Sequence, residues 1–227
     1  MTEVSVVVPV FNEESNVVPL VQEIVAALDG RVDFEIVFVD DGSSDGTLAR
    51  LREAQADIAR LRVLAHGENC GQSAALRSGI GAASGQLIVT LDGDGQNDPG
   101  DIPAVLERFR SVATDGRIGM VSGRRMKRKD TWSKRMASQI GNSVRRFILR
   151  DGAADTGCAL KAFRREDFLR LPYFDHMHRY LAALMLREGL AVDFVDVRHR
   201  PRRHGTSKYG VLDRALVSVA DLFGVWW

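Results

Sequence analysis

The chain has 227 residues, of which 45% are hydrophobic and 27% charged, and its formal net charge is +1. This length fits one large domain, or one domain with an appendage. The near-neutral charge excludes a generally basic nucleic-acid-binding protein. Cys70 and Cys158 are too few for a disulfide framework and lack zinc-ligand spacing, so we expect two reduced thiols in a cytosolic setting. We interpret Cys158 as a small buried residue rather than a nucleophile.

The first half of the chain alternates strand-like apolar runs with segments of helical periodicity. This alternation predicts an α/β fold with a mostly parallel central sheet flanked by helices on both faces. Ser15 and Asp45 are suitable N-cap residues, and Pro99 suits the start of a helix. The predicted strands are Val4–Val10, Phe34–Val39, Leu61–Ala65 and Leu87–Leu91, and the predicted helices run from Ser15 to Leu28, from Asp45 to about Asp57, from about Gln72 to Ala83 and from Pro99 to Arg110.

The second half begins with a change in composition. A basic loop, Arg124 to Lys129, is predicted after the strand Met120–Gly123. The last segment, Val211 to Trp227, has apolar residues at helical spacing and two final tryptophans, so it either packs on the core or lies at a membrane interface. We therefore divide the chain into a domain over 1–210 and an amphipathic C-terminal helix over 211–227. Between them we predict a helix from Trp132 to Leu149, strands over Leu160–Phe163 and Val192–Val197, and a helix across Tyr180–Arg187.

No segment of the sequence is predicted to cross a membrane. No apolar stretch reaches the roughly 18 to 20 residues that a spanning helix needs. The strand pattern starts at Val4 without a charged-then-apolar leader before it.

Polar side chains follow three of the predicted parallel strands, where open α/β sheets bind their ligands. Glu13 comes soon after the first strand, Asp40 and Asp41 end the second, and Asp92 and Asp94 follow the strand that ends at Leu91. The last two are two residues apart, which aims both carboxylates the same way in an extended chain. Such oxygen donors suit Mg²⁺ or Mn²⁺ bridging to a phosphate. Simple Asp-Gly turns and helix capping are the alternatives, and the convergence of three strand ends favours nucleotide contact.

Other nucleotide-dependent folds are disfavoured by the turn after the first strand. Its Asn12-Glu13-Glu14 lacks the glycines of a dinucleotide fingerprint and the basic residue that a nucleotidyltransferase would want there. A glycine loop with lysine of the P-loop type occurs nowhere in the chain.

The order and spacing of several motifs resemble glycosyltransferase family 2, in its branch of dolichol- and undecaprenyl-phosphate glycosyltransferases. The resemblance spans nearly the whole chain. It is carried by Val7-Val8-Pro9-Val10-Phe11-Asn12-Glu13-Glu14, Val39-Asp40-Asp41-Gly42-Ser43, Asn69-Cys70-Gly71-Gln72-Ser73-Ala74-Ala75-Leu76, Leu91-Asp92-Gly93-Asp94-Gly95-Gln96, Asp155-Thr156-Gly157-Cys158, His178-Arg179-Tyr180, Arg200-Pro201-Arg202 and Gly205-Thr206-Ser207-Lys208-Tyr209-Gly210.

The resemblance implies a GT-A fold and a set of site residues. The metal, Mg²⁺ or Mn²⁺, would lie among Asp92, Asp94 and Gln96. Asp40 and Asp41 would lie near the nucleoside, and the base pocket would be lined by Pro9, Phe11 and Glu13. In the resembling branch, residues such as Arg124, Arg135 and Ser138 hold the lipid phosphate. Arg202, Ser207 and Lys208 look like a lid over the donor diphosphate, with flanking glycines as hinges. The remaining cations of the basic loop, Arg125, Lys127, Arg128 and Lys129, are interpreted as a solvated face or as a contact for anionic lipid headgroups.

The type of acceptor is predicted from the absence of a candidate general base in the sequence. The only Glu-Asp pair after the metal motif, Glu166-Asp167, stands at an apparent helix start, where acids favour the first turn. A hydroxyl acceptor needs a general base, whereas a phosphomonoester, with a second pKa of about 6, is already ionised.

We therefore expect inverting, metal-dependent transfer from a UDP- or GDP-sugar to a polyprenyl phosphate. The setting is the cytoplasmic face of the membrane, with peripheral contact. The alternatives are a soluble transferase acting on a polysaccharide or protein hydroxyl, and a non-catalytic sugar-nucleotide-binding domain. The identity of the sugar, the base and the prenol depends on pocket shape rather than on sequence pattern.

Overall fold

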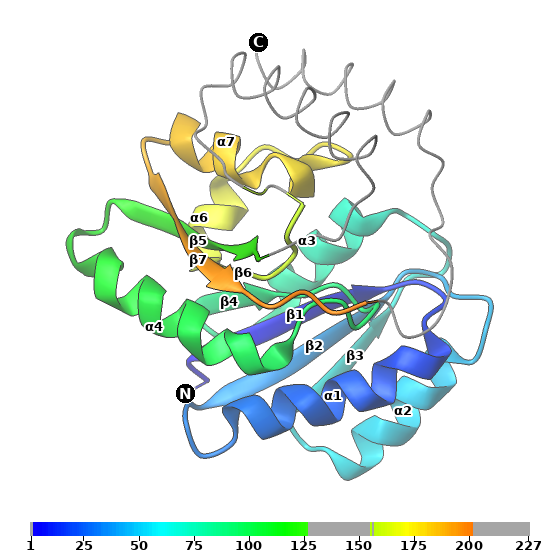
Figure 1. The fold of residues 1–227 in the computed structure, drawn as a ribbon. Helices are drawn as coiled ribbons and strands as arrows, with labels where there is room; N and C mark the ends of the chain where they lie inside the picture. The colour runs from blue at the N-terminus through cyan, green and yellow to red at the C-terminus, as the bar shows by residue number, and fades with distance from the viewer. Residues whose placement is uncertain (1, 127–154, 156, 202–227) are drawn as a thin grey trace, which may run out of the picture.

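A seven-stranded sheet forms the centre of the protein (Figure 1). The structure, a computed structural model, describes residues 2–126, 155 and 157–201, and every statement below about the fold refers to these residues. The strands lie in the order β3-β2-β1-β4-β6-β5-β7. Their bounds are β1 Val4–Val10, β2 Phe34–Asp40, β3 Leu61–Ala65, β4 Leu87–Thr90, β5 Ile118–Arg125, β6 Lys161–Arg164 and β7 Ala191–Val197.

All strands of the sheet except β6 run in one direction. β1 is parallel to β2 and β4, and β2 is parallel to β3. β6 is antiparallel to both of its neighbours, β4 and β5, while β7 is parallel to β5. The carboxyl ends of six strands and the first residue of β6 therefore lie along one edge of the sheet, which we call the carboxyl edge. The expected mostly parallel α/β sheet is confirmed.

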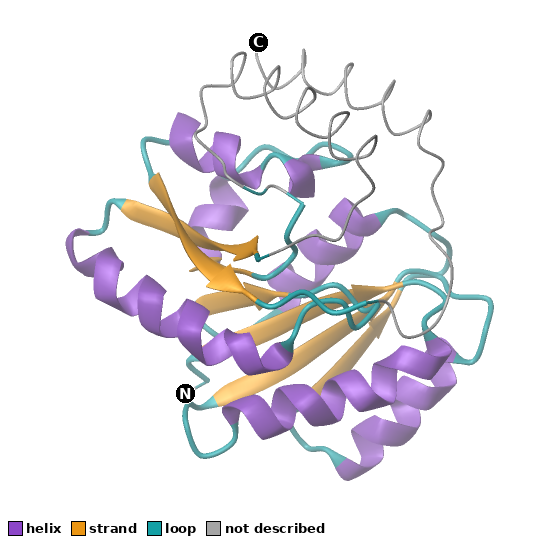
Figure 2. Ribbon diagram, viewed as in Figure 1, coloured by secondary structure: helices purple, strands orange, loops and turns teal. Residues whose placement is uncertain are grey.

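Helices cover both faces of the sheet (Figure 2). One face packs against α1, α2 and α4, and the other against α3, α6 and α7. Every residue of β1 and β2 is buried, because strands covered on both sides expose neither face. The helices are α1 Glu14–Leu28, α2 Thr47–Asp57, α3 Gln72–Ala82, α4 Ile102–Val112, α6 Arg165–Arg170 and α7 Leu181–Arg187, with 3₁₀ turns η1 Pro99–Asp101, η2 Ala113–Asp115 and η3 Met177–Arg179.

The two faces contain separate hydrophobic cores, divided by the alternation of side chains along each strand. Val6 and Val8 of β1 pack in the core beneath α1, together with Ile24. Val7 points the other way and packs with Ile80 of α3. The sheet is thus held between two hydrophobic cores, and these fix the position of its carboxyl edge.

The helix starts differ in part from the sequence expectation. α1 begins at Glu14, so Ser15 is not its cap. Asn12, with a φ of 54°, turns the chain before the helix, and its Oδ1 accepts a hydrogen bond from the Ser44 amide at 2.8 Å. The N-cap of α2 is Gly46 rather than Asp45, but the carboxylate of Asp45 accepts a hydrogen bond from the amide of Thr47, the first residue of α2, at 2.9 Å. Long-range contacts between the two loops therefore decide where α1 begins.

β5 is longer than expected. It continues through Arg124 and Arg125, because these residues pair in register with Asp196 and Val197 of β7. The basic loop that was expected from Arg124 therefore cannot begin before Met126. The predicted helices over 132–149 and 211–227 lie outside the described residues.

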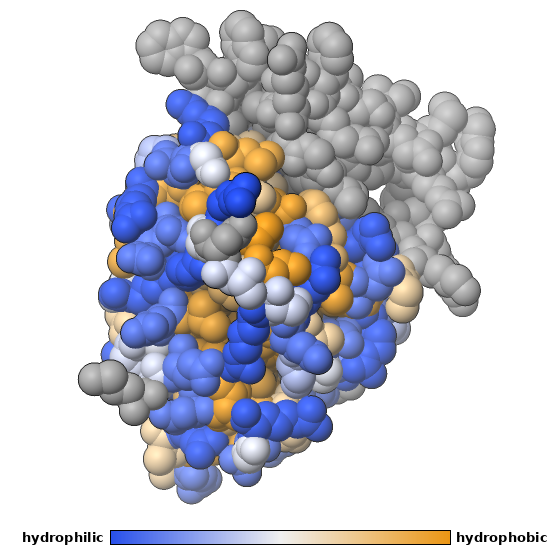
Figure 3. Space-filling view, turned by 90° about the vertical axis from the view of Figure 1, so that its left-hand side faces the viewer, coloured by the Kyte–Doolittle hydropathy of each residue, from blue (hydrophilic) through white to orange (hydrophobic). Residues whose placement is uncertain are grey.

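The face beside β5, β7 and α4 is mainly hydrophilic, with hydrophobic residues visible between hydrophilic ones (Figure 3). None of the helices in the described part of the chain combines the length and apolar character that crossing a bilayer requires.

Candidate active site

Three strand ends meet around one cavity at the carboxyl edge. Pro9 of β1, Asp92 just after β4 and Lys161 at the start of β6 line a cavity of about 240 Å³. Residues of η3 close it from the side of α3, with His178 and Arg179 among its walls. The antiparallel direction of β6 brings Lys161 to this edge, since its first residue pairs with Thr90 at the end of β4.

The loop Asp92 to Gln96 is packed tightly against β1. A Cβ atom on Gly93 would lie 2.3 Å from Cγ1 of Val10, so only glycine fits there. Asp94 is 8% exposed, and its Oδ1 accepts a hydrogen bond from the Gln96 amide at 3.0 Å. Asp92 is partly buried, and its Oδ1 accepts from Nε2 of Gln72 at 2.8 Å. The two carboxylates are therefore held in a short, fixed loop.

The electrostatic environment of Asp92 favours binding of a cation. Burial, followed by the negative charge of Asp94, raises the pKa of Asp92 to about 6. Lys161, the hydrogen bond from Gln72 and Arg125 act in the opposite direction. A divalent ion would relieve the repulsion between the two carboxylates, and the side chains of Asp92, Asp94 and Gln96 offer the oxygen ligands that Mg²⁺ or Mn²⁺ prefers.

Asp40 has one carboxylate oxygen without a partner. The residue is buried, and its Oδ2 accepts from the Ser43 amide at 3.3 Å. Within the described residues its buried Oδ1 has no hydrogen-bond partner. A buried acceptor without a partner is uncommon, so Oδ1 of Asp40 calls for a donor that the described residues do not supply. Asp40 thus fits the expected contact with a nucleoside.

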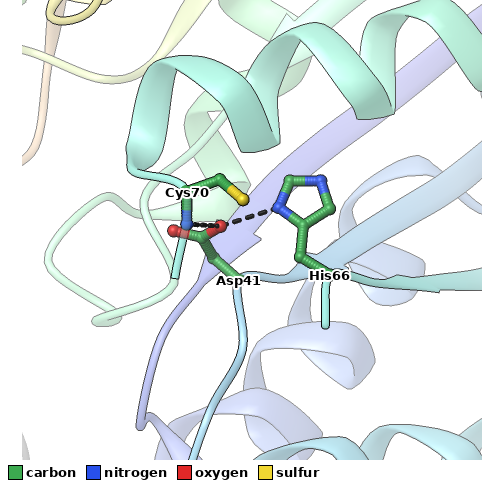
Figure 4. Close-up of side chains that lie close together, drawn as sticks. All are labelled: Asp41, His66 and Cys70. Atoms are coloured by element: carbon green, nitrogen blue, oxygen red, sulfur yellow. Dashed lines mark hydrogen bonds and ion pairs between the residues drawn. The ribbon is translucent and has the colours of Figure 1, made fainter. Parts of the chain in front are cut away.

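Asp41, which was expected beside the nucleoside, makes several contacts to the neighbouring loop (Figure 4). Its Oδ1 contacts Nδ1 of His66 at 2.7 Å and accepts from the Cys70 amide at 3.0 Å, while Oδ2 accepts from the Gly71 amide at 2.8 Å. The ligand atoms of Asp41, His66 and Cys70 lie within 4.8 Å of one another. The hydrogen bonds account for this closeness, so we assign Asp41 the role of holding residues 66–71 against the end of β2.

The other expected donor-site residues are placed as follows. Pro9 lines the cavity. Phe11 is half-buried just beyond β1. Glu13 accepts a hydrogen bond from Nδ2 of Asn16 at 2.6 Å, so its carboxylate is engaged at the start of α1. Five expected site residues lie outside the described residues: Arg135, Ser138, Arg202, Ser207 and Lys208.

Two adjacent arginines at the end of β5 make different ion pairs. Arg124 is exposed, and its Nε lies 2.6 Å from Oδ1 of Asp196. Arg125 makes a bidentate pair with Asp155, with both N–O distances at 2.7 Å, and its side chain is only 12% exposed. The expectation that Arg125 belongs to a solvated basic face is therefore wrong. Its hydrogen bonds to Asp155 outweigh the effect of burial and raise the pKa of Arg125.

Lys161 and His178 are site residues to which sequence reasoning assigned no role. Lys161 is 6% exposed, and its Nζ donates to the carbonyl oxygen of Cys158. Burial lowers the pKa of Lys161, although Cys158 and Asp92 oppose this. His178 contacts Oγ of Ser73 through Nδ1 at 2.8 Å, and burial, with the charge of Arg179, lowers its pKa to about 3. The sequence feature that could have indicated Lys161 is the position of a lysine at the start of a short apolar strand.

Two expectations about other reactive groups are confirmed. Glu166 and Asp167 lie in the first turn of α6, which follows the end of β6 at the edge opposite to Asp92. This pair is therefore no general base for the cavity. Cys158 is buried and Cys70 exposed, and both are free thiols.

A family model described as Glycosyl transferase family 2 matches residues 5–171, which is well over half of the chain. The chain belongs to glycosyl transferase family 2. Among curated members, dodecaprenyl-phosphate galacturonate synthase from Rhizobium johnstonii is 36% identical over 228 residues, covering 98% of this chain and 66% of the relative. Undecaprenyl-phosphate 4-deoxy-4-formamido-L-arabinose transferase from Edwardsiella ictaluri is 34% identical over 211 residues, covering 92% and 63%. The chain spans slightly less than two thirds of the length of these relatives.

Solved structures of similar fold include two transferases. Glucosyl-3-phosphoglycerate synthase from Mycobacterium tuberculosis, in complex with UDP, superimposes with a TM-score of 0.74 at 20% identity, covering 99% of this chain and 80% of that one. The mannosyltransferase PcManGT from Pyrobaculum calidifontis, in complex with GDP-Man and Mn²⁺, gives 0.71 at 22% identity, covering 98% and 63%. This family 2 chain therefore has the expected GT-A fold.

Proposed function

We propose that the chain carries the catalytic domain of a metal-dependent, inverting transferase that moves a sugar from a nucleotide-sugar to a polyprenyl phosphate. The observation that carries the proposal is the pair Asp92 and Asp94, held in one short loop, of which Asp92 lines a cavity that also contains a buried lysine. The similarity to polyprenyl-phosphate sugar transferases supports the acceptor class.

The donor's nucleoside would lie at the ends of β1 and β2. Oδ1 of Asp40, which has no partner among the described residues, can accept a ring N–H, which both uracil and guanine present. A divalent ion held by Asp92, Asp94 and Gln96 would neutralise the diphosphate as it leaves the sugar. Asp41 would lie near the nucleoside as well, and it also fixes the loop beside this position.

The acceptor needs cations rather than a base. A phosphate monoester is already largely ionised at neutral pH, and no acid pair of α6 reaches the cavity. Arg124, at the end of β5, is the described residue of the proposed acceptor-phosphate group, and Arg135 and Ser138 complete it. Arg202, Ser207 and Lys208 remain the proposed lid over the diphosphate. We place the reaction at the cytoplasmic membrane face, with peripheral contact by the chain.

The test is a product assay with purified protein. A panel of labelled UDP- and GDP-sugars is offered with a polyprenyl phosphate and Mn²⁺, and a soluble hydroxyl acceptor is the matched control. We expect label to enter the organic phase only with the lipid phosphate, and chelator to abolish the transfer. Label that reaches only the hydroxyl acceptor, or full turnover in chelator, would contradict the proposal.

A further inference from the structure

A buried ammonium group lines the cavity beside Asp92 without forming an ion pair among the described residues. Lys161 is flanked in the sheet by the neutral residues Thr90 on β4 and Ser122 on β5. Its Nζ donates to the Cys158 carbonyl oxygen, which leaves two N–H groups of the ammonium for other acceptors. An ionised group removed from water is strongly unfavourable unless an opposite charge and hydrogen bonds compensate it.

Asp92, the carboxylate that lines the same cavity, already has other interactions. Asp92 accepts a hydrogen bond from Gln72 and is the proposed ligand of the divalent ion. Arg179 also lines the cavity and adds a second cation, and it forms no ion pair with another described residue. His178, which lines the same cavity, is held by Ser73, and its low pKa of about 3 keeps it neutral. The lining of the cavity therefore contains two cationic side chains as well as the carboxylate of Asp92.

We propose that Lys161 is an anion-binding residue of this cavity, where its ammonium group holds an oxyanion of a substrate. The oxyanion is either the phosphate of the acceptor or the carboxylate of an acidic sugar. This inference rests on the proposed function, because it names the chemistry of the group that enters the proposed site. Arg179 provides a second positive charge in the lining of the same cavity.

The first test measures binding without turnover. Inorganic phosphate and glucuronate are titrated separately into the wild-type chain and into Lys161→Met, followed by NMR. We expect at least one anion to bind roughly 10- to 100-fold more weakly to the variant, as expected for the loss of one charge-assisted hydrogen bond. Equal affinities of both anions for the two proteins would overturn the inference.

The second test separates the two sources of the anion. If the acceptor phosphate binds Lys161, Lys161→Met raises the KM for polyprenyl phosphate by a similar factor and leaves donor preference unchanged. If a sugar carboxylate binds it, the ratio of kcat/KM for UDP-glucuronate over UDP-glucose falls, while the acceptor KM is unchanged. A folded variant with both quantities at wild-type values would contradict the proposal.

Controls distinguish binding from folding. Lys161→Met removes a buried charge, so its thermal unfolding midpoint should be at least that of the wild type. Lys161→Arg keeps the charge and should retain more anion affinity than Lys161→Met. Arg170→Gln is the matched control, because it removes an exposed cation of α6. This variant should bind both anions with wild-type affinity. If the wild type binds an anion through Lys161 yet transfers no sugar, the proposed function fails while the anion site stands.

Discussion

Asp94 combines burial with a rigid loop, and this makes it the more constrained of the two proposed metal ligands. We predict that Asp94→Asn lowers the transfer rate by roughly 10²- to 10³-fold, the loss typical of one electrostatic contact to the developing charge. The amide oxygen can still accept from Gln96, so the unfolding midpoint should change little. Mn²⁺ binding and initial rates are the measurements, and Asp57→Asn at the exposed end of α2 is the control. Wild-type Mn²⁺ affinity in the Asp94 variant would remove it from the metal site.

The pKa of Asp92 gives the metal site a pH dependence. In the metal-free protein this pKa is about 6, above its ordinary value of 3.8. Protons and the cation compete for the same carboxylate, so the apparent affinity for Mn²⁺ should fall as the pH drops below about 6. Titrations of Mn²⁺ from pH 5 to pH 8 measure this. The same affinity at pH 5 and pH 7 would contradict the assignment.

The same raised pKa also affects the stability of the metal-free protein, with a defined sign. A carboxyl group whose pKa is higher in the folded state contributes stability below pH 4, and this contribution is lost as the pH rises through 6. Asp92→Asn should therefore flatten the dependence of unfolding free energy on pH between 4 and 6.

Arg124 can be tested against its own ion-pair partner. If it holds the acceptor phosphate, Arg124→Ala raises the KM for polyprenyl phosphate, because a positive charge is lost from that position. Asp196→Asn is the matched change, since it breaks the same pair but leaves Arg124 free for the acceptor. We expect wild-type or lower KM for the acceptor in Asp196→Asn. Equal impairment of both variants would show that the pair matters only for structure.

At the scale of elements, Glu35 joins the amino ends of the parallel strands. From β2 it accepts hydrogen bonds from Oγ of Ser5 and the amide of Ser84, each at 2.6 Å, and from Arg62 at 2.8 Å. Burial alone would raise its pKa, but these hydrogen bonds prevail and lower the pKa of Glu35 to about 2. The network therefore stabilises the charged form.

We predict that Glu35→Gln costs about 2 kcal/mol of unfolding free energy at pH 7. The stabilisation by Glu35 is present above its ordinary pKa of 4.5 and is lost as the pH falls towards 2. The difference between the two proteins should thus shrink from pH 5 to pH 3, as urea unfolding would show. Glu53→Gln, on the exposed side of α2, is the control. A pH-independent difference would contradict this account.

The elements differ in how far the sequence could predict them. β1 and β2 were predictable because burial on both faces requires continuous apolar runs. The direction of β6 was not, because nothing within Lys161–Arg164 encodes which neighbour it pairs with. The length of β5 was underestimated for a related reason. Two consecutive arginines are typical of a loop, and their place in a strand depends on pairing with β7.

The same contrast holds within the site. Asp92 and Asp94 were predictable from local spacing, because the metal loop is formed by consecutive residues. Lys161 reaches the cavity only through the antiparallel pairing of β6, and the side chain of Asp41 is committed by a loop some 30 residues further along the chain. Local pattern identifies ligands within one loop, whereas the remaining contacts depend on tertiary structure.

At the scale of the whole molecule, β5 and β7 both end at the carboxyl edge, because they run in parallel. The described chain beyond β7 stays at the edge that contains Asp92, because the Arg200 amide donates to the carbonyl oxygen of Gln96 at 2.9 Å. The proposed membrane contact would place the lipid acceptor on the same side as the cavity.

The basic residues after β5 provide the test of this contact. We predict that replacing Lys127, Arg128 and Lys129 by glutamine weakens binding to anionic vesicles by roughly fivefold per charge, given about 1 kcal/mol per charge near such a surface. Vesicle flotation at low and high salt measures it. The control carries glutamine at three exposed arginines elsewhere, Arg31, Arg52 and Arg187. Equal flotation of both triple variants would argue against a role for the basic segment.

β1 begins at Val4, on the rim of the sheet remote from Asp92 (Figure 1). A reporter or an immobilising linker fused ahead of this strand would therefore project away from both substrates. Such a fusion would allow the protein to be immobilised on a chip or bead with its carboxyl edge facing the solution and accessible to vesicles.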